Sequence, residues 1–316
     1  RGYSAKLSVD MLARERAHPD VAYVECNQIV TIAQDQCVDQ PNVLWNLDRI
    51  SEVLLDLDGH YYYPSSAGQG VNAYVIDTGI QINNVDFEGR ASWGFAVDRQ
   101  NVDGNGHGTH VASTVGGKLY GVAKKVTLIA VKVLGTNGSG TIAGVISGVD
   151  YVTNAHQSGT RPSVANMSLG GGRSAALVSA VENSIGVGVT YAVAAGNDNA
   201  NACNYSPADA PNALTVGATT STDVRSSFSN YGTCVDIFAP GTTITAAWIG
   251  QPNAVRTISG TSMASPHVAG AAAIVLGRNP SFSPSQVYDA VTSGATNNVL
   301  QNVGPGSPNL LLYSSC

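Results

Sequence analysis

Apolar strand-like runs alternate with helical patterns along most of this chain, from Gln34 onward, and this alternation limits the possible folds more than any other feature. Strands that alternate with helices pack as a parallel sheet with helices on both faces. We therefore expect an α/β fold with a doubly wound, mostly parallel central sheet. The expected strands are 71–77, 126–133, 163–168, 188–194 and 213–218, and the expected helices are 108–116, 140–154, 174–185, 262–276 and 283–293.

Length and composition exclude several classes of protein. The chain has 316 residues, of which 43% are hydrophobic, so it can bury a large core in one main domain. Its net charge of −6 argues against a nucleic-acid partner, which would call for a basic surface. No apolar run approaches the ~18 residues that a membrane span needs. We therefore expect no membrane partner either.

One serine lies where the sequence favours a nucleophile. Ser262 stands in the small-residue peptide Gly260–Gly270, at the start of the expected helix 262–276. Backbone N–H groups and the positive end of the helix dipole gather there, which suits a hydroxyl whose attack generates an oxyanion. Because a hydroxyl alone is a weak nucleophile, this interpretation requires a base and a group that orients the base.

Three residues upstream supply the missing groups. His107, in the peptide 104–112, leads a short helix and is the candidate base. Asp77 ends the apolar strand 71–77, at the sheet edge where open α/β folds place their chemistry, and can hold the imidazole N–H. Asn197 ends another strand and can donate to the oxyanion together with the Ser262 N–H.

Other histidine and serine chemistry is disfavoured by spacing. His110 and His267 read as side chains that pack or hydrogen-bond in the interior. The peptide His107–His110 lacks the spacing of a zinc-protease helix. Ser262 does not stand in the G-x-S-x-G elbow of an α/β-hydrolase. The combination of Asp77, His107 and Ser262, rather than any one of them, carries the prediction.

The order Asp77, His107, Asn197 and Ser262, each inside its own motif, resembles the subtilisin-like serine proteases, or subtilases. The branch of proteinase K and aqualysin is most similar. The resemblance covers roughly residues 45–313 and includes the peptides 120–124, 165–172 and 228–232. It implies the subtilisin-like three-layer fold and a secreted serine endopeptidase. In such an enzyme His107 takes the Ser262 proton, Ser262 attacks the peptide carbonyl, and Asn197 helps to hold the oxyanion.

The resemblance also implies a substrate cleft. Protein or peptide substrates bind there by strand addition, and side-chain pockets set the preference. The small residues of the first specificity pocket leave it roomy and uncharged, so we expect broad specificity with apolar or aromatic residues preferred before the cut bond. The implied lining residues are Asn137, Gly138 and Ser139 on one side, Ser168, Leu169 and Gly170 on the other, and Ala194, Ala195 and Gly196 at the pocket wall.

The chain has five cysteines, and the resemblance pairs Cys203 with Cys234. Closing that loop would stabilise the fold by roughly 3–4 kcal/mol on the chain-entropy model. The partners of Cys26, Cys37 and Cys316 stay open, with a free thiol or an intermolecular bridge as alternatives. A disulfide favours an oxidising, extracellular setting.

Calcium is the cofactor that the resemblance implies, in a structural role. Its ligands would be the backbone carbonyls of Pro211 and Ala213 and the carboxylate of Asp236, which are hard oxygen donors. A second site of relatives would fall on Asp48, Glu52 and Asp58. Ser51 and His60 depart from the usual ligands there, and we interpret those acids as a solvated surface.

Residues 1–33 differ from the rest. A strand over 2–8, a charged amphipathic helix over 9–17 and a strand over 21–25 resemble the C-terminal half of a subtilase propeptide, a small α+β domain that assists folding and then inhibits. The predicted domains are this segment, 1–33, and a peptidase domain, 34–316, with a cleavage junction near Ala33. A plain N-terminal extension is the alternative.

Two other functions compete with a secreted endopeptidase. The chain would be a latent, self-inhibited precursor if residues 1–33 keep the cleft filled, and a non-catalytic binding protein is a separate alternative. An esterase that shares the same three residues would hydrolyse small esters and leave protein intact. The relatives lead us to expect a monomer in each case.

Overall fold

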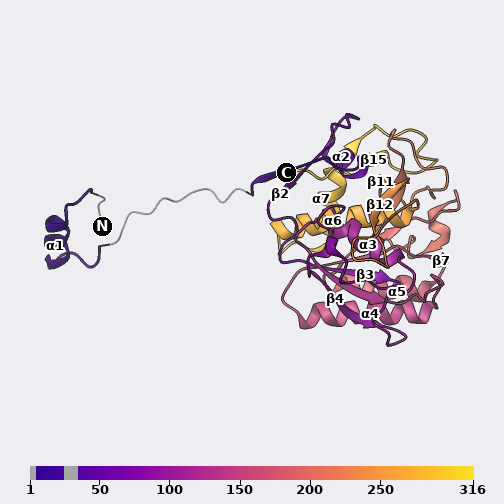
Figure 1. The fold of residues 1–316 in the computed structure, drawn as a ribbon, viewed down its shortest axis with the longest axis horizontal. Helices are drawn as coiled ribbons and strands as arrows, with labels where there is room; N and C mark the ends of the chain where they lie inside the picture. The colour runs from indigo at the N-terminus through magenta and orange to yellow at the C-terminus, as the bar shows by residue number, and fades with distance from the viewer. Residues whose placement is uncertain (1–4, 25–34) are drawn as a thin grey trace. The chain divides into compact units, whose positions relative to one another are not determined.

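The computed structural model describes residues 5–24 and 35–316, which belong to two compact units, Arg1–Gln34 and Asp35–Cys316. The smaller unit contains helix α1, Val9–Ala17 (Figure 1), and this confirms the predicted helix. Ser8 begins the helix by accepting a hydrogen bond from the Met11 N–H, and no residue of the helix is buried.

The two strands predicted beside α1 are not formed over the described residues 5–8 and 21–24. A strand requires a partner and an apolar face to bury, and none of the described side chains of this unit is buried, with Val9 at 84% exposed. The other residues of those predicted strands, and the junction near Ala33, lie outside the described residues.

The larger unit is built on a nine-stranded sheet that is parallel except for its last pair, β14 and β15. Valine and alanine fill the central strands because both faces of the sheet are covered. All five predicted strands are confirmed, as β3, β5, β6, β8 and β10. The order across the sheet is β14 (Thr296–Asn297), β15 (Leu310–Leu311), β11 (Ile237–Pro240), β10 (Leu214–Thr219), β8 (Thr190–Ala194), β6 (Ser163–Met167), β3 (Asn72–Asp77), β5 (Thr127–Lys132) and β4 (Ala91–Ala96).

Helices cover both faces of this sheet, which gives the three layers expected for the fold (Figure 1). Helices α3 and α6 enclose one apolar core with the sheet, and α4 and α5 enclose another on the opposite face. The five predicted helices are confirmed. They are α3 (His107–Gly116), α4 (Ile142–Ser158), α5 (Ala175–Gly186), α6 (Thr261–Arg278) and α7 (Pro284–Ser293).

Helix α6 lies against five strands of the sheet, β10, β8, β6, β11 and β3. Its alanine and glycine residues are buried almost throughout, and small side chains allow this close approach of helix to sheet. Helix α7 packs on α6 and begins with a capping box between Ser283 and Gln286.

Several shorter elements were not predicted. They are β1 (Cys37–Pro41), α2 (Trp45–Ser51), β2 (His60–Pro64), the 3-10 turns Val85–Phe87 and Ala202–Asn204, β4, β7 (Gly171–Gly172), β9 (Tyr205–Ser206), β11, β12 (Ile244–Ala247), β13 (Val255–Ile258), β14 and β15. Most are polar or only two to five residues long, apart from α2 and β4, so they carry little periodic signal.

Two disulfides join parts of the larger unit. The predicted pair Cys203–Cys234 is confirmed. Cys37, in β1, pairs with Cys316 at the other end of the chain, across 279 residues of sequence. Arg278 reinforces this closure, because it contacts both the Asp35 carboxylate (3.3 Å) and the Cys316 carbonyl (3.3 Å). Cys26 lies outside the described residues.

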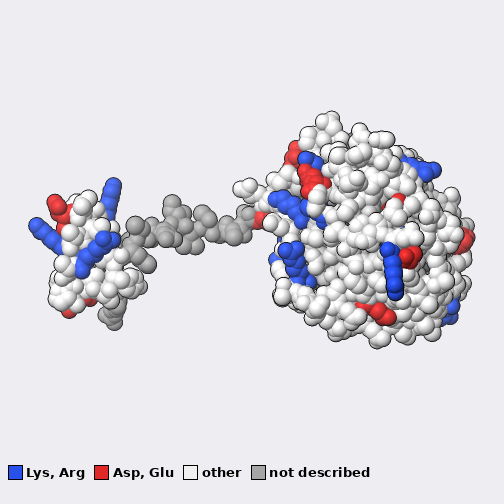
Figure 2. Space-filling model, turned by 60° about the horizontal axis from the view of Figure 1, so that its bottom comes forward, with Lys and Arg blue, Asp and Glu red and all other residues white. Residues whose placement is uncertain are grey.

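The surface of the larger unit carries few charges. On the face drawn in Figure 2, lysine, arginine, aspartate and glutamate side chains are scattered over a largely uncharged surface. None of the helices in residues 5–24 and 35–316 is long and apolar enough to cross a membrane.

Candidate active site

The four predicted catalytic residues come from ends of elements that meet at one edge of the sheet. Asp77 is the last residue of β3, and Asn197 follows the end of β8. His107 is the first residue of α3, and Ser262 is the second residue of α6. Because parallel strands end at the same edge, chain segments far apart in sequence converge there.

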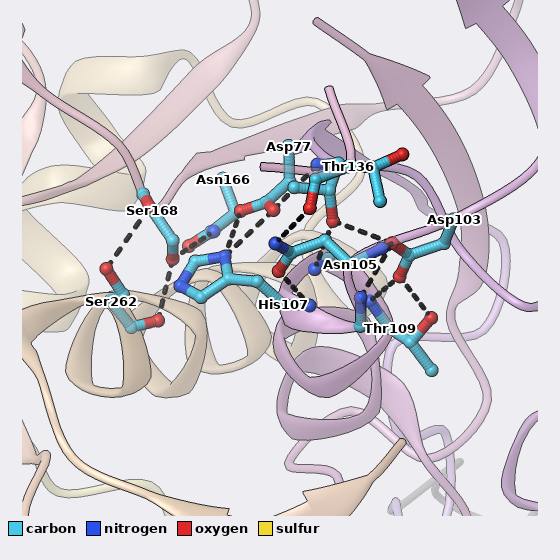
Figure 3. A network of polar contacts seen from close by, with 12 residues as sticks. Asp77, Asp103, Asn105, His107, Thr109, Thr136, Asn166, Ser168 and Ser262 are labelled. Atoms are coloured by element: carbon cyan, nitrogen blue, oxygen red, sulfur yellow. Dashed lines mark hydrogen bonds and ion pairs between the residues drawn. The ribbon is translucent and has the colours of Figure 1, made fainter. Parts of the chain in front are cut away.

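Asp77 and His107 form a close pair (Figure 3). The imidazole Nδ1 lies 2.8 Å from Oδ1 and 2.9 Å from Oδ2 of the carboxylate. The Asp77 side chain is fully buried, whereas a quarter (25%) of the His107 side chain is exposed. Burial alone would lower the pKa of His107, but the charge of Asp77 and its hydrogen bond outweigh burial and raise that pKa above its usual value. The pair therefore favours a protonated Nδ1 and leaves Nε2 to exchange protons.

Ser262 lies beside Ser168, and the two residues bond reciprocally (Figure 3). The Ser262 hydroxyl donates to the Ser168 carbonyl (3.2 Å), and the Ser168 hydroxyl donates to the Ser262 carbonyl (2.7 Å). Asn166 in turn donates to the Ser168 hydroxyl (2.9 Å). Among the described residues the Ser262 hydroxyl has no hydrogen bond to His107; such bonds are often long before substrate binds.

The amide of Asn197 is oriented by Thr261. Its Oδ1 accepts from the Thr261 N–H (2.8 Å) and from the Thr261 hydroxyl (3.0 Å). This leaves Nδ2 as the remaining donor, next to the turn that leads into Ser262. The preceding residue must be glycine, because Gly196 has φ +101° and a Cβ there would clash with the Asn230 amide.

A cavity of about 430 Å³ opens beside His107, whereas Asp77, Asn197 and Ser262 are not among the residues that line it. His107 lines it together with Gly138, Ser139, Ser168, Leu169 and Gly170 of the predicted cleft. Asn137 is exposed near its rim, where its side chain accepts from the Ser139 N–H. Ala194, Ala195 and Gly196 of the predicted pocket wall are not among the residues that line this cavity, and Ala194 and Ala195 are buried.

Sequence reasoning missed an apolar part of the cavity wall. Leu134, Ile142, Val145 and Leu177 line it, from the end of β5 and the starts of α4 and α5. The sequence did carry a signal for this wall, namely the apolar residues in the first turns of the expected helices 140–154 and 174–185. Asp103, which accepts from the Thr109 N–H in the first turn of α3, and Asn166, which donates to the Ser168 hydroxyl, were also missed.

His110 and His267 lie in the interior, as predicted. His110 Nε2 contacts the Ile244 carbonyl (3.0 Å), and His267 lies between Asn46 (2.9 Å) and the Met263 carbonyl (2.8 Å). Burial lowers the pKa of both histidines to about 4, so both are neutral near pH 7.

Asp236 stands at the predicted calcium site, just before β11. Thr215 N–H and Tyr288 O–H donate to its two carboxylate oxygens (2.8 and 2.6 Å). Burial raises its pKa to about 6 in spite of these bonds. The Pro211 and Ala213 carbonyls accept none of the backbone bonds that the described residues form outside helices and strands. A carboxylate whose charged form is disfavoured by burial, and two carbonyls without such backbone bonds, are oxygen donors of the kind that calcium takes.

The acids 48, 52 and 58 do not form the uniformly solvated surface that we predicted. Asp58 is exposed, but Asp48 is buried (2% exposed), and its Oδ1 has no hydrogen-bond partner among the described residues. Burial, with repulsion from Asp58 and Asp56, raises the pKa of Asp48. The cause is the position of Asp48 on α2, which packs inward on β2 and β11.

Known proteins resemble this chain over nearly all of its length. The model of the subtilase family matches residues 68–309. An extracellular serine proteinase of Thermus sp. (strain Rt41A) is 53% identical over 317 residues, which span 99% of this chain and 75% of that protein. Alkaline protease 2 of Aspergillus fumigatus is 46% identical over 338 residues, 99% of this chain and 68% of that protein. The crystal structure of a cold adapted subtilisin-like serine proteinase shares 52% identity and a TM-score of 0.83, over 87% of this chain and 99% of that one.

Proposed function

The chain belongs to the subtilase family and is a serine endopeptidase, and from this premise we propose that Ser262 is its nucleophile, His107 its general base and Asp77 the carboxylate that orients the base. The observation that carries the proposal is the buried Asp77 paired with His107 at 2.8 Å, at the sheet edge where α6 presents Ser262. Its substrates are proteins or peptides.

The geometry supports the following proton transfers. With Nδ1–H held by Asp77, the Nε2 lone pair of His107 takes the Ser262 proton as Oγ attacks the scissile carbonyl. The oxyanion is held by the Ser262 N–H and by Asn197 Nδ2. His107 then gives the proton to the leaving amine, and water attacks the acyl-enzyme by the same route.

A fluorophosphonate that reacts with activated serines tests this assignment. Intact mass should show one adduct per chain, peptide mapping should place it on Ser262, and casein digestion should stop as the adduct forms. Casein cleavage that persists in fully labelled protein, or an adduct on another serine, would contradict the proposal. Ester hydrolysis without casein cleavage would identify an esterase instead.

Asn197→Ala should lower kcat on the order of 10²–10³-fold with little change in KM, a magnitude taken from a subtilisin. The donor acts on the oxyanion, which exists only after attack. Steady-state kinetics on a peptide anilide would measure the loss. Asn154→Ala, at an exposed position of α4, is the matched control and should keep the wild-type rate. A fall confined to KM would assign Asn197 to ground-state binding.

The apolar cavity wall supports broad specificity with a preference for apolar side chains in the substrate. Leu134, Ile142, Val145 and Leu177 face a space of about 430 Å³ and offer no carboxylate that would select lysine or arginine. An extended substrate would add as a strand along Ser168–Gly170.

The Asp236 site supports a structural calcium ion, held with the Pro211 and Ala213 carbonyls. An ion that binds only the folded chain at 100 times its Kd adds about 2.7 kcal/mol, which is roughly 5–10 °C in Tm for a domain of this size. Calorimetry of phosphonylated enzyme, with calcium or with chelator, measures this shift. The Asp236→Asn variant should lose it. A shift that persists there but disappears in Asp48→Asn would move the ion to α2.

The N-terminal unit supports a maturation step. Helix α1 buries no residue of its own, as expected for a fragment of a propeptide that is cut near Ala33 and acts as an intramolecular inhibitor.

The names of the relatives and the Cys203–Cys234 bridge support an extracellular enzyme. We propose that the mature enzyme is a monomer.

A further inference from the structure

The first turn of α3, which carries His107, is capped entirely by side chains from outside the helix. Its N-cap residue, Gly106, has no side chain and a φ of +101°. Each of the first three N–H groups of a helix lacks a partner within the helix, and here each finds one in a neighbouring loop. These bonds run from His107 N to Asn105 Oδ1 (3.2 Å), from Gly108 N to Thr78 Oγ1 (2.9 Å) and from Thr109 N to Asp103 Oδ2 (3.1 Å).

Asp103 is the centre of this cap (Figure 3). It is 5% exposed, and five donors surround its carboxylate. An ionised carboxylate only accepts hydrogen bonds, so it is the species that this set of donors fits. The donors are the Thr78 hydroxyl (2.9 Å), the N–H groups of Asn105 (3.0 Å) and Gly106 (2.8 Å), and the N–H (3.1 Å) and hydroxyl (2.6 Å) of Thr109.

The same carboxylate ties the end of β3 to the start of α3. Thr78 follows Asp77 and donates its N–H to the Asp77 carboxylate (2.7 Å). Its hydroxyl accepts from Gly108 and donates to Asp103. The segment that carries Asp77 and the turn that carries His107 are therefore both anchored on Asp103, and this anchoring fixes how the two side chains meet.

The position of His107 also makes its positively charged form electrostatically unfavourable. As the first residue of α3 it lies at the positive end of the helix dipole, which disfavours the imidazolium. The proposed reaction requires that imidazolium in both transition states. A negative charge at the same helix end offsets the dipole.

Few charged groups act on His107. Asp77 approaches from β3 and Asp103 from the loop before α3, and both favour the imidazolium. His110, one turn further along α3, is neutral near pH 7. Lys132 on β5 is paired with Asp98 (3.1 Å), and Arg256 on β13 stacks over Trp248.

We propose that Asp103 is a positioning residue for the catalytic histidine, a second carboxylate that aligns His107 with Asp77 and supports its positive charge from the helix end. The proposal rests on the proposed function, in which His107 is the general base. It assigns to a buried loop aspartate a role in the reaction rather than in folding alone.

Asp103→Asn is the decisive variant, and Asp86→Asn is its matched control. Asp86 is equally buried (3% exposed) and also holds α3, through the Ser113 hydroxyl (2.6 Å), but two turns away from His107. The measurements are kcat and KM on a peptide anilide from pH 5 to 9, with thermal unfolding of each phosphonylated variant.

Asp103→Asn should lower kcat about 10- to 100-fold at nearly constant KM, the scale of a small misalignment of catalytic groups. The acid limb of the pH profile should also move to lower pH, because His107 loses a negative neighbour. Asp86→Asn should lower Tm while its acid limb and kcat stay those of the wild type. An acid limb that does not move in Asp103→Asn, with a kcat equal to that of Asp86→Asn, would overturn the proposal.

Thr109→Val keeps the test decisive if Asp103→Asn does not fold. It removes one donor to Asp103, together with the acceptor of the Gln81 N–H (2.9 Å), and keeps the Asp103 charge, so kcat should fall severalfold while the acid limb stays in place. A wild-type kcat in this variant would overturn the positioning role. Fluorophosphonate labelling of the wild type separates the two levels of inference, because an unlabelled Ser262 would contradict the proposed function itself.

Discussion

Ser262→Ala is expected to lower kcat on casein or a peptide anilide by on the order of 10⁶-fold, because the acyl-enzyme route disappears with the hydroxyl. The variant should fold normally, since the Ser262 side chain makes one hydrogen bond to the described part of the chain, to the Ser168 carbonyl (3.2 Å). It should also keep residues 1–33 attached. The wild-type chain, incubated under the same conditions, should lose about that segment.

Intact mass and casein digestion, followed side by side, check both outcomes. Ser147→Ala, at an exposed position of α4, is the control for the loss of a serine hydroxyl and should process and digest like the wild type. A Ser262→Ala chain that still loses its N-terminal segment would show that another protease cuts there. A wild-type chain that stays whole and spares casein would support the latent precursor.

Asp77→Asn is expected to lower kcat by about 10⁴-fold, because the amide can hold the wrong imidazole tautomer and cannot stabilise the imidazolium. The Asp77 charge and hydrogen bond raise the pKa of His107, and a base works only when neutral. In the wild type activity therefore falls as the pH drops through a pKa above the usual value of histidine. In Asp77→Asn this fall in activity on the acid side of the pH profile should move to lower pH.

The pH dependence of kcat/KM for wild type and variant measures this shift. The double variant Asp77→Asn, Ser262→Ala should be no slower than Ser262→Ala alone, because residues that act as a unit are not additive. Asp150→Asn, at an exposed position of α4, controls for the removal of a carboxylate. An Asp77→Asn enzyme within tenfold of the wild type would remove Asp77 from the mechanism.

The parts of the fold that could be predicted from sequence are those that bury long apolar runs. Strand β3 and helix α6 have such runs, so their patterns are strong. Strand β1 reads Cys-Val-Asp-Gln-Pro and forms only because β2 pairs with it. The strands predicted over 2–8 and 21–25 are not formed over the described residues 5–8 and 21–24 for the opposite reason, since no described side chain of their unit is buried.

The residues of the candidate site likewise fall into those that the sequence predicts and those that only the fold reveals. Asp77, His107 and Ser262 stand in local motifs, and each motif is readable in isolation. The role of Asp103 is not readable, because one of its donors, Thr78, lies 25 residues earlier and is brought close only by the fold. The pairing of Cys37 with Cys316 spans 279 residues, so no local spacing of cysteines predicts it.

The Cys37–Cys316 bridge changes the effect of a proteolytic cut on the peptidase unit. With Cys37 joined to Cys316, the peptidase unit is covalently a ring. A first nick in any exposed loop between them opens the ring into a linear chain and releases nothing, and the two new ends stay near each other in the folded unit. A single cut of this unit by another protease molecule therefore leaves it in one covalent piece, and only a second cut can detach a fragment.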